Sequence, residues 1–247
     1  MPSYRSDTAA LAPLETFSVR AFAPDEAFPA SVCGFVLALA VIYDDLKDIA
    51  QADHLLASEV PASQNAYTRE RGQVAGIQAH IRRHLSATIY ELLRLVEANL
   101  VILSEPAFVV TVRNLPNEIR AEWESITAVA ENRDAKGSLA EALRFVRDKV
   151  GFHYDRKELL RGYEAHFSED PTRPAFISRG ESLQSSRFYF ADAAAQAYFR
   201  VQLAAHDPSH YFSWGSPLIR AVNRALHEIV IAFIQRRSAF REYRPGS

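Results

Sequence analysis

Apolar residues recur every three or four positions along most of this chain, which is the spacing of one face of an α-helix. The clearest stripes run from Phe28 to Ile49 and from Val74 to Val96. Shorter stripes predict further helices over residues 116–129, 139–151, 155–163, 191–203 and 217–241. Phe108–Val112 is rich in β-branched side chains, so it predicts a short extended piece.

Signals for helix ends divide the region around residue 150. Ser138 and Glu141 match a capping box that starts one helix, and Gly151 is well placed to end it. Asp155 and Glu158 form a second capping signature that starts the next helix. Residues 152–154 therefore form a short joint between two helices, a place where function is often found.

The helical pattern lapses between residues 171 and 186. Two short apolar runs, Phe176–Ser178 and Arg187–Phe190, flank this polar stretch and predict a small β-hairpin near 176–190. The whole pattern predicts an all-α bundle of five to seven helices. We expect an irregular arm over 1–24, a helical bundle over 25–168, and a C-terminal helical extension over 169–247 that packs on the bundle.

Composition narrows the function classes. Of the 247 residues 48% are hydrophobic, enough for a sizeable core, and the formal net charge of −2 gives no general attraction to nucleic acid or anionic membranes. Cys33 is the only cysteine, so an intramolecular disulfide and a cysteine-based zinc site are excluded. The longest apolar run, Phe35–Tyr43, is too short to span a bilayer, and the first residues lack the features of a signal peptide. We therefore expect a cytoplasmic protein without a membrane segment.

The joint carries the residues that best suit chemistry. Arg147 is always cationic and can form paired hydrogen bonds to a phosphate, and histidine, here His153, is the side-chain type best suited to proton transfer near neutral pH. Asp148 and Tyr154 stand beside them. This set indicates either a phosphodiester-cleaving site or an interhelical cap in which His153 bonds to backbone and Arg147 pairs with an acid.

The spacing of Arg147 and His153 resembles the R-x(4–6)-H signature of the HEPN families, small prokaryotic helical bundles that include metal-independent ribonucleases. The resemblance implies an RNA endonuclease with His153 as acid and base and Arg147 as phosphate stabiliser. Asp148, where those families often have asparagine, and Tyr154 would shape the site. It further implies a homodimer that acts on RNA with no cofactor or metal. The alternative is a non-catalytic module for dimerisation or protein-partner binding, of a defence or toxin–antitoxin type.

Two other groups resemble metal sites. Asp44 and Asp48 fit the D-D-x-x-D pattern of magnesium-dependent isoprenoid enzymes and lie on one helix face. We find no second acidic motif, and Lys47 lies within the first, so a solvated acidic face is the favoured interpretation. His80 and His84 also lie one turn apart, but the flanking arginines favour a polar helix face.

The C-terminal third adds two further candidates. His206 and His210 are placed to bind a metal only if their loop folds back. A group of aromatic residues is suited either to stacking on bases or to packing in the core; its members are Phe188, Tyr189, Phe190, Tyr198, Phe199, Tyr211, Phe212 and Trp214. Core packing is the simpler interpretation.

Overall fold

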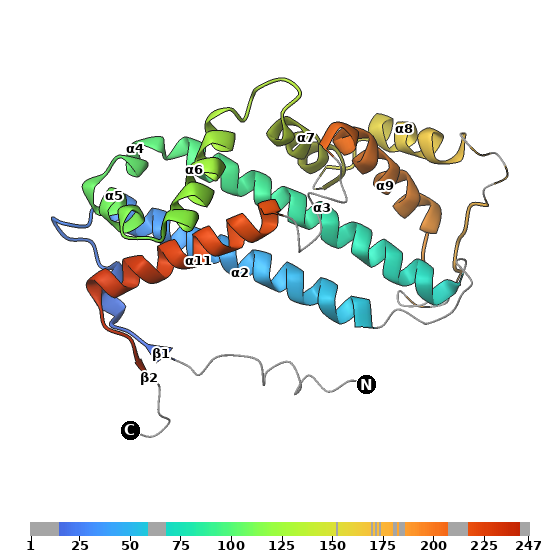
Figure 1. Cartoon of the computed structure of the whole chain (residues 1–247). Helices are drawn as coiled ribbons and strands as arrows, with labels where there is room; N and C mark the ends of the chain where they lie inside the picture. Colours follow the sequence, from blue (N-terminus) through green and yellow to red (C-terminus); the bar gives the residue numbers. More distant parts are fainter. Residues whose placement is uncertain are drawn as a thin grey trace.

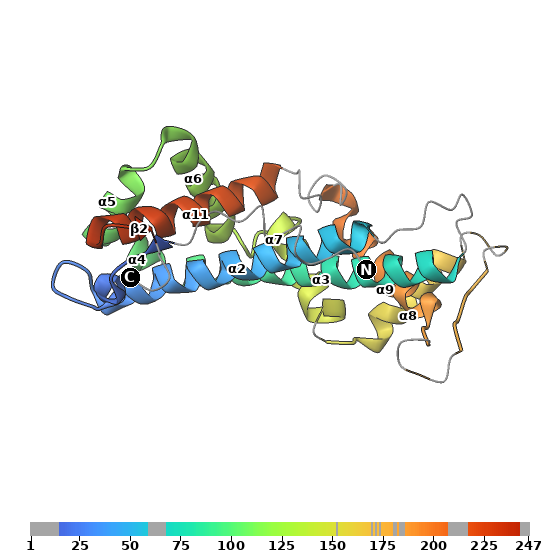
Figure 2. The ribbon, with the colours of Figure 1, turned by 90° about the horizontal axis from the view of Figure 1, so that it is seen from below.

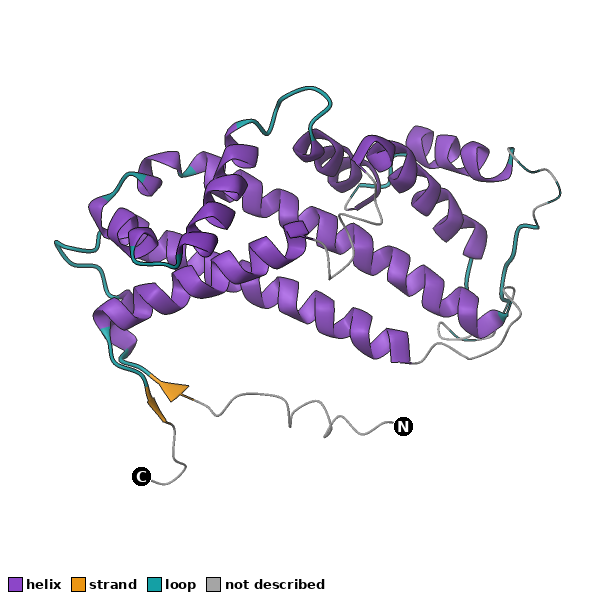
Figure 3. Ribbon diagram, viewed as in Figure 1, coloured by secondary structure: helices purple, strands orange, loops and turns teal. Residues whose placement is uncertain are grey.

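Two long helices form the spine of the protein. The computed structural model describes residues 15–58, 68–151, 153–168, 170, 172, 174–179, 182, 186–206 and 217–242. Helix α2 (Ala30–Ser58) and helix α3 (Arg69–Ala98) run side by side through the middle of the molecule (Figure 1). At 1.5 Å per residue each is roughly 45 Å long. The all-α prediction is confirmed (Figure 3).

Four helices cover one end of this spine. They are α4 (Leu100–Leu103), α5 (Pro106–Arg113), α6 (Asn117–Glu131) and α11 (Pro217–Arg237). Helix α11 packs against α2, α5 and α6, so it belongs to the same core. The rings of Phe35 and Trp123 both pack on Phe108, with centroids 5.4 and 5.9 Å from it.

Residues 108–112 correct one sequence-based prediction, because they lie in helix α5 instead of an extended piece. Pro106 occupies the first turn of α5, where its missing N–H costs no hydrogen bond. Phe108 and Thr111 are buried three residues apart, so packing on one helical face outweighs β-propensity. The described residues contain nine α-helices where five to seven were expected, since α4 and α5 are too short to show a periodic stripe.

The other end of the spine carries the remaining helices. Helix α7 (Leu139–Val146) continues into a π-helical turn (Arg147–Gly151), and α8 (Arg156–Phe167) and α9 (Tyr189–Leu203) follow. Helix α9 packs on α3, α7 and α8. Figure 2 shows α6 and α11 on one side of the α2–α3 pair and α8 on the other. A short 3-10 turn, Ala204–His206, follows α9.

Extended structure is scarce in the described part of the chain. Strand β1 (Glu15–Thr16) pairs antiparallel with β2 (Arg241–Glu242), next to a 3-10 turn at Val19–Phe22. Helix α11 therefore ends at Arg237 and not at Arg241 as its charge pattern suggested. Near 176–190 a single antiparallel bridge joins Ser178 to Arg187, so the chain turns back as expected. None of the described helices combines the length and the apolar character needed to cross a membrane.

The crossing of α8 and α9 yields a paired prediction. Gly162 lies so close to the Ala194 carbonyl that an added Cβ would overlap it, whereas a Cβ on Gly34 of α2 would meet nothing within 4 Å. We expect Gly162→Ala to lower the free energy of unfolding by about 1–3 kcal/mol through overpacking. Gly34→Ala should raise it by about 0.5–1 kcal/mol, because glycine is unfavourable inside a helix. Urea unfolding measures both, and a Gly162→Ala protein as stable as the wild type would contradict the close crossing.

Candidate functional site at the joint between α7 and α8

Local capping interactions fix the entrance to the joint. The Ser138 hydroxyl accepts a hydrogen bond from the Glu141 N–H at 3.1 Å, as the capping box predicts. The Glu141 carboxylate reaches back to the N–H of Gly137, at 2.7 Å, one residue before the expected partner. Gly137 has φ +75°, in the left-handed region that glycine tolerates best. The start of α7 is thus fixed by its own sequence.

The last turn before the joint is wound as a π-helix. Residues Arg147–Gly151 take this wider winding directly after α7, and Val150 within it is fully buried. Arg83 of α3 donates a hydrogen bond to the Val150 carbonyl at 3.3 Å. Gly151 ends the helical backbone, as its sequence position indicates, but the change of winding was not predicted. Such π turns are rare in proteins overall, and those that occur often lie at functional sites.

Asp155 fixes the exit from the joint. Its Oδ1 accepts hydrogen bonds from the N–H groups of Lys157 and Glu158, which confirms it as the N-cap of α8. Its Oδ2 binds Lys149 Nζ at 2.8 Å, and its N–H donates to the Lys149 carbonyl at 3.0 Å. The Lys149 ammonium, helped by the helix N–H groups, holds the pKa of Asp155 below its ordinary value.

Arg147 lies between two carboxylates. Its Nη2 is 2.8 Å from Glu91 of α3 and its Nη1 is 2.7 Å from Asp148. Glu91 also pairs with Arg94 at 3.1 Å, so alternating charges link the π turn to α3 in the order Asp148, Arg147, Glu91, Arg94. The Asp148 hydrogen bond, with Glu91 nearby, raises the pKa of Arg147. Arg147 thus ties the π turn to α3, and the acids balance its charge.

His153 and Tyr154 are exposed at the bend of the joint. The Tyr154 side chain is 76% exposed, and His153 is also exposed. Among the described residues His153 has no side-chain hydrogen bond or ion pair. The structure therefore brings Arg147 and Asp148 together and leaves the imidazole of His153 open to solvent. Phe152, which directly precedes His153, lies outside the described residues. An accessible imidazole can exchange protons with a bound molecule.

Arg83 is the site residue that the sequence reasoning missed. Its Nε is buried without a hydrogen-bond partner, and no ion pair within the described ranges includes it. Burial lowers the pKa of Arg83, while the Asp192 carboxylate and Tyr154 act in the opposite direction. Arg83 continues a second buried stripe on α3 through Gly76, Ala79 and Ser86, a helical spacing that could have distinguished it from exposed Arg82.

The acidic pattern on α2 meets the histidine pair of α3 in a separate groove of about 350 Å³. Asp45 and Asp48 line it from α2, and His80 and His84 line it from α3, with their rings stacked at 5.8 Å. Asp45, and not Asp44, lines this groove together with Asp48. Within the described ranges no three histidine, cysteine or acidic side chains are grouped to hold a metal ion.

The C-terminal candidates have mixed outcomes. Tyr198 and Phe199 are buried, which supports core packing, whereas Phe188 is largely exposed. Burial raises the pKa of Tyr198 to about 12. His206 ends the 3-10 turn after α9, and His210, Tyr211, Phe212 and Trp214 lie outside the described residues.

No protein-family model, curated protein or solved structure matches this chain. A functional proposal therefore depends on the geometry of the joint and on the short Arg147–His153 pattern.

The cap of α8 gives a prediction on pH dependence. Because the pKa of Asp155 is lowered on folding, its charge stabilises the fold above the ordinary aspartate pKa, and this contribution is lost as pH falls through the folded pKa. Asp155→Asn keeps a capping side chain but loses the charge, so it should melt at a lower temperature than wild type at pH 7. The difference should shrink below about pH 4. Asp44→Asn, at an exposed position of α2, is the control. A difference between Asp155→Asn and wild type that stays constant from pH 7 to pH 3 would contradict this role.

Proposed function

We propose that the protein binds RNA at the joint between α7 and α8 and cleaves it without a metal ion. The observation that carries this proposal is Arg83, a half-buried guanidinium without a carboxylate partner among the described residues, next to a joint with an exposed histidine. A guanidinium recognises phosphate, as it does carboxylate, through paired hydrogen bonds. The same joint carries the Arg147–His153 spacing that resembles the HEPN ribonucleases.

Energetics support a ligand at Arg83. A buried donor without a partner destabilises a protein by about 1–3 kcal/mol, and more when it is charged. A phosphate bound at the outer nitrogens of the Arg83 guanidinium would supply the opposite charge. Arg147 remains the second cation of the proposed site, since its side chain is still 26% exposed beside Glu91 and Asp148. Asp148 would orient Arg147, and Tyr154 would line the path to His153.

The proposed reaction is a transesterification. The ribose 2′-oxygen attacks the adjacent phosphorus and the P–O5′ bond breaks, which leaves a 2′,3′-cyclic phosphate and a 5′-hydroxyl. His153 in its neutral form accepts the proton of the 2′-hydroxyl, and the leaving 5′-oxygen takes a proton from an imidazolium. One histidine cannot hold both protonation states at once, so we propose that His153 of a second copy supplies the acid in a homodimer.

An exposed face of α2 supports self-association, and it also favours the alternative function of a non-catalytic dimerisation module. Leu37 and Val41 lie one turn apart and are 50% and 56% exposed. Gly34, on the same face, would permit close approach of another helix. Both functions share this interface and differ only in cleavage.

The catalytic proposal predicts the effect of removing the imidazole. His153→Ala should abolish cleavage of single-stranded RNA and leave the melting temperature unchanged, because the side chain has no described partner. Chelation with EDTA should have no effect, and the wild-type products should carry cyclic phosphates in mass spectrometry. His54→Ala, at an exposed position of α2, is the control. Unchanged cleavage by His153→Ala would refute the assignment, and RNA binding without cleavage by the wild type would favour the binding module.

The neighbouring Arg82 provides a control that distinguishes a specific phosphate site at Arg83 from a general effect of net charge. Arg83→Gln and exposed Arg82→Gln lose the same charge, but only Arg83→Gln should weaken RNA binding by more than about tenfold, since a hydrogen bond to a charged group contributes about 1.5–3 kcal/mol. Fluorescence anisotropy with a labelled oligonucleotide measures both. Equal weakening by the two variants would show that only general charge matters.

If Leu37 and Val41 of α2 form the dimer interface, the wild type should be a dimer and charged substitutions at these positions should dissociate it. Light scattering of the wild type at micromolar concentration should give twice the 27.7 kDa chain mass. Leu37→Asp with Val41→Asp should give the monomer mass, because a carboxylate in an apolar contact loses its hydration. Val101→Asp, at the exposed position of α4, should stay dimeric. A monomeric wild type would remove the two-histidine site.

A further inference from the structure

Helix α8 carries an apolar stripe that stays largely open to solvent. Leu160, Tyr163 and Phe167 follow one another at intervals of three and four residues, which places them on one face of the helix. Gly162, on the opposite face, is buried where α8 packs against the backbone of α9. Leu160 is 57% exposed and Tyr163 is 38% exposed, so the stripe faces away from α9.

Ring contacts extend this stripe to the start of α9. The centroid of the Tyr163 ring lies 4.6 Å from that of Phe167 and 6.4 Å from that of Phe190. The Phe190 ring in turn lies 5.9 Å from Phe188, which directly precedes α9 and is 62% exposed. We call the surface formed by Leu160 and these four rings the aromatic face. Adjoining apolar side chains that remain exposed often mark a binding surface.

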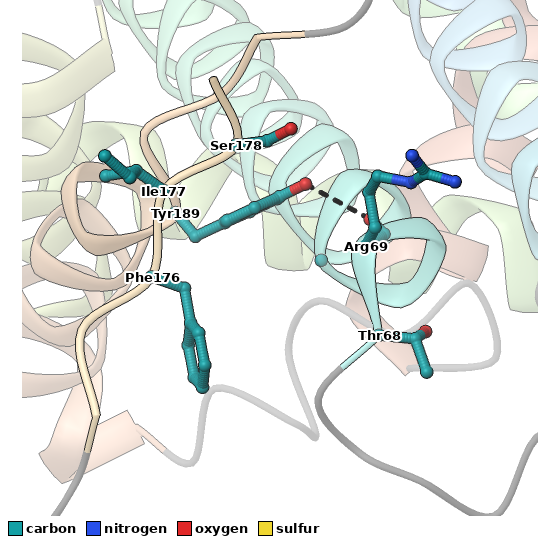
Figure 4. A pocket seen from close by; sticks show the side chains of 7 residues that line it. Thr68, Arg69, Phe176, Ile177, Ser178 and Tyr189 are labelled. Atoms are coloured by element: carbon teal, nitrogen blue, oxygen red, sulfur yellow. Dashed lines mark hydrogen bonds between the residues drawn. The ribbon is translucent and has the colours of Figure 1, made fainter. Parts of the chain in front are cut away.

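The chain before α9 adds a recess beside the aromatic face. The Phe190 N–H donates a hydrogen bond to the Phe176 carbonyl at 3.3 Å, so this segment is held against the start of α9. Phe176, Ile177 and Tyr189 line a hollow of about 250 Å³ (Figure 4). The Tyr189 hydroxyl donates to the Arg69 carbonyl at 3.2 Å, which ties the wall of the hollow to α3. The rings around the aromatic face are therefore held in place by contacts of their own.

Positive charge lies at the end of the aromatic face that is nearest the joint. Arg156 and Lys157 are exposed in the first turn of α8, and neither forms an ion pair within the described part of the chain. Arg156 precedes Leu160 by one helical turn, so it lies on the same side of α8. Both cations also follow His153 and Tyr154 closely in sequence. Exposed rings beside cations without carboxylate partners suit a ligand that offers flat groups and negative charges together.

We propose that the aromatic face binds the unpaired bases of an RNA strand whose backbone passes Arg156 and Lys157 on its way to the joint. Aromatic side chains stack on bases of any sequence, while cations track the phosphates between them. From Arg156 to Phe167 the helix axis advances roughly 16 Å, about five nucleotides at the 3.4 Å spacing of a stacked strand. Bases inside a duplex cannot reach these rings, so the substrate class is single-stranded RNA. This inference rests on the proposed binding of RNA at the joint.

A strand without bases separates stacking from charge. Fluorescence anisotropy with the intact chain compares an RNA of about ten nucleotides with an abasic strand of the same length, both protected from cleavage by 2′-methoxy groups. Phe188→Leu keeps an apolar side chain but loses the flat ring. It should bind the RNA at least about fivefold more weakly than wild type and bind the abasic strand equally well. Phe188→Tyr keeps the ring and should bind both strands as wild type. Equal weakening of both strands by Phe188→Leu would overturn the stacking role.

A second variant tests the aromatic face without changing a ring. Leu160→Glu places a carboxylate at an exposed position beside the proposed strand, so it should weaken binding of both strands, because like charges repel. Val201→Glu makes the matching change at an exposed position of α9 outside the aromatic face and should bind as wild type. Wild-type affinity in Leu160→Glu would overturn the proposed path of the strand, and it would do so even if Phe188→Leu failed to fold.

The controls distinguish this inference from the proposed function. Phe17→Leu repeats the ring substitution next to β1, at the other end of the molecule from α8, and should bind as wild type (Figure 1). If Arg83→Gln weakens RNA binding but Phe188→Leu does not, the inference is overturned while the site at the joint stands, and the aromatic face is left to a protein partner. A wild type that binds neither strand would overturn the proposed function as well.

Discussion

The fold depends on the burial of α3 along more than one face. Helices α2, α6, α7 and α9 and the π turn all pack on it. A single apolar stripe would allow α3 to pack against one neighbouring helix, but α3 also buries the small residues Gly76, Ala79, Ser86 and Ala87. These small residues let other backbones approach closely, and Ser86 satisfies its hydroxyl within the helix by bonding to the Arg82 carbonyl at 2.7 Å. A helix covered on several sides becomes the common support for everything else.

The charged residues of α3 extend this support to the segments around it. Glu91 holds Arg147 of the π turn, and Arg83 holds the carbonyl of Val150. Farther along, Glu97 pairs at 2.5 Å with Arg133, whose guanidinium also lies over the Tyr90 ring at 5.4 Å. Arg133 and Arg147 are only 16% and 26% exposed, so both ion pairs are partly buried. Their effect is to fix register, since each joins α3 to an element that is distant in sequence.

Helical periodicity predicted most of the fold because a helix is a local structure. The caps at Ser138 and Asp155 depend on residues within four positions of them, and the N-cap bond of each side chain was predicted correctly. The misassignment of Phe108–Val112 had the opposite cause, because contact with Phe35 and Trp123 decides its conformation. The candidate site likewise contains contacts between sequence neighbours and contacts between distant segments. Asp148 and Arg147 meet as sequence neighbours, whereas Glu91 and Arg83 reach the joint only through packing of α3. Helical spacing can mark Arg83 as partly buried, but it cannot place Arg83 at the joint.

The π turn at Arg147–Gly151 has a consequence for how the chain tolerates changes of length. A π turn uses about one residue more per turn than an α-helix, so it is equivalent to a single inserted residue. Removal of one residue there would restore regular winding, and the residues that follow would keep nearly their present orientation, because the wider turn already absorbs the surplus. Removal of a residue from the regular helix α7 would instead rotate all that follows by about 100° about the helix axis, so that Asp155 would leave Lys149 and another side chain would stand where His153 now lies. The π turn is thus the place in this segment where the chain can lose a residue without redirecting the joint.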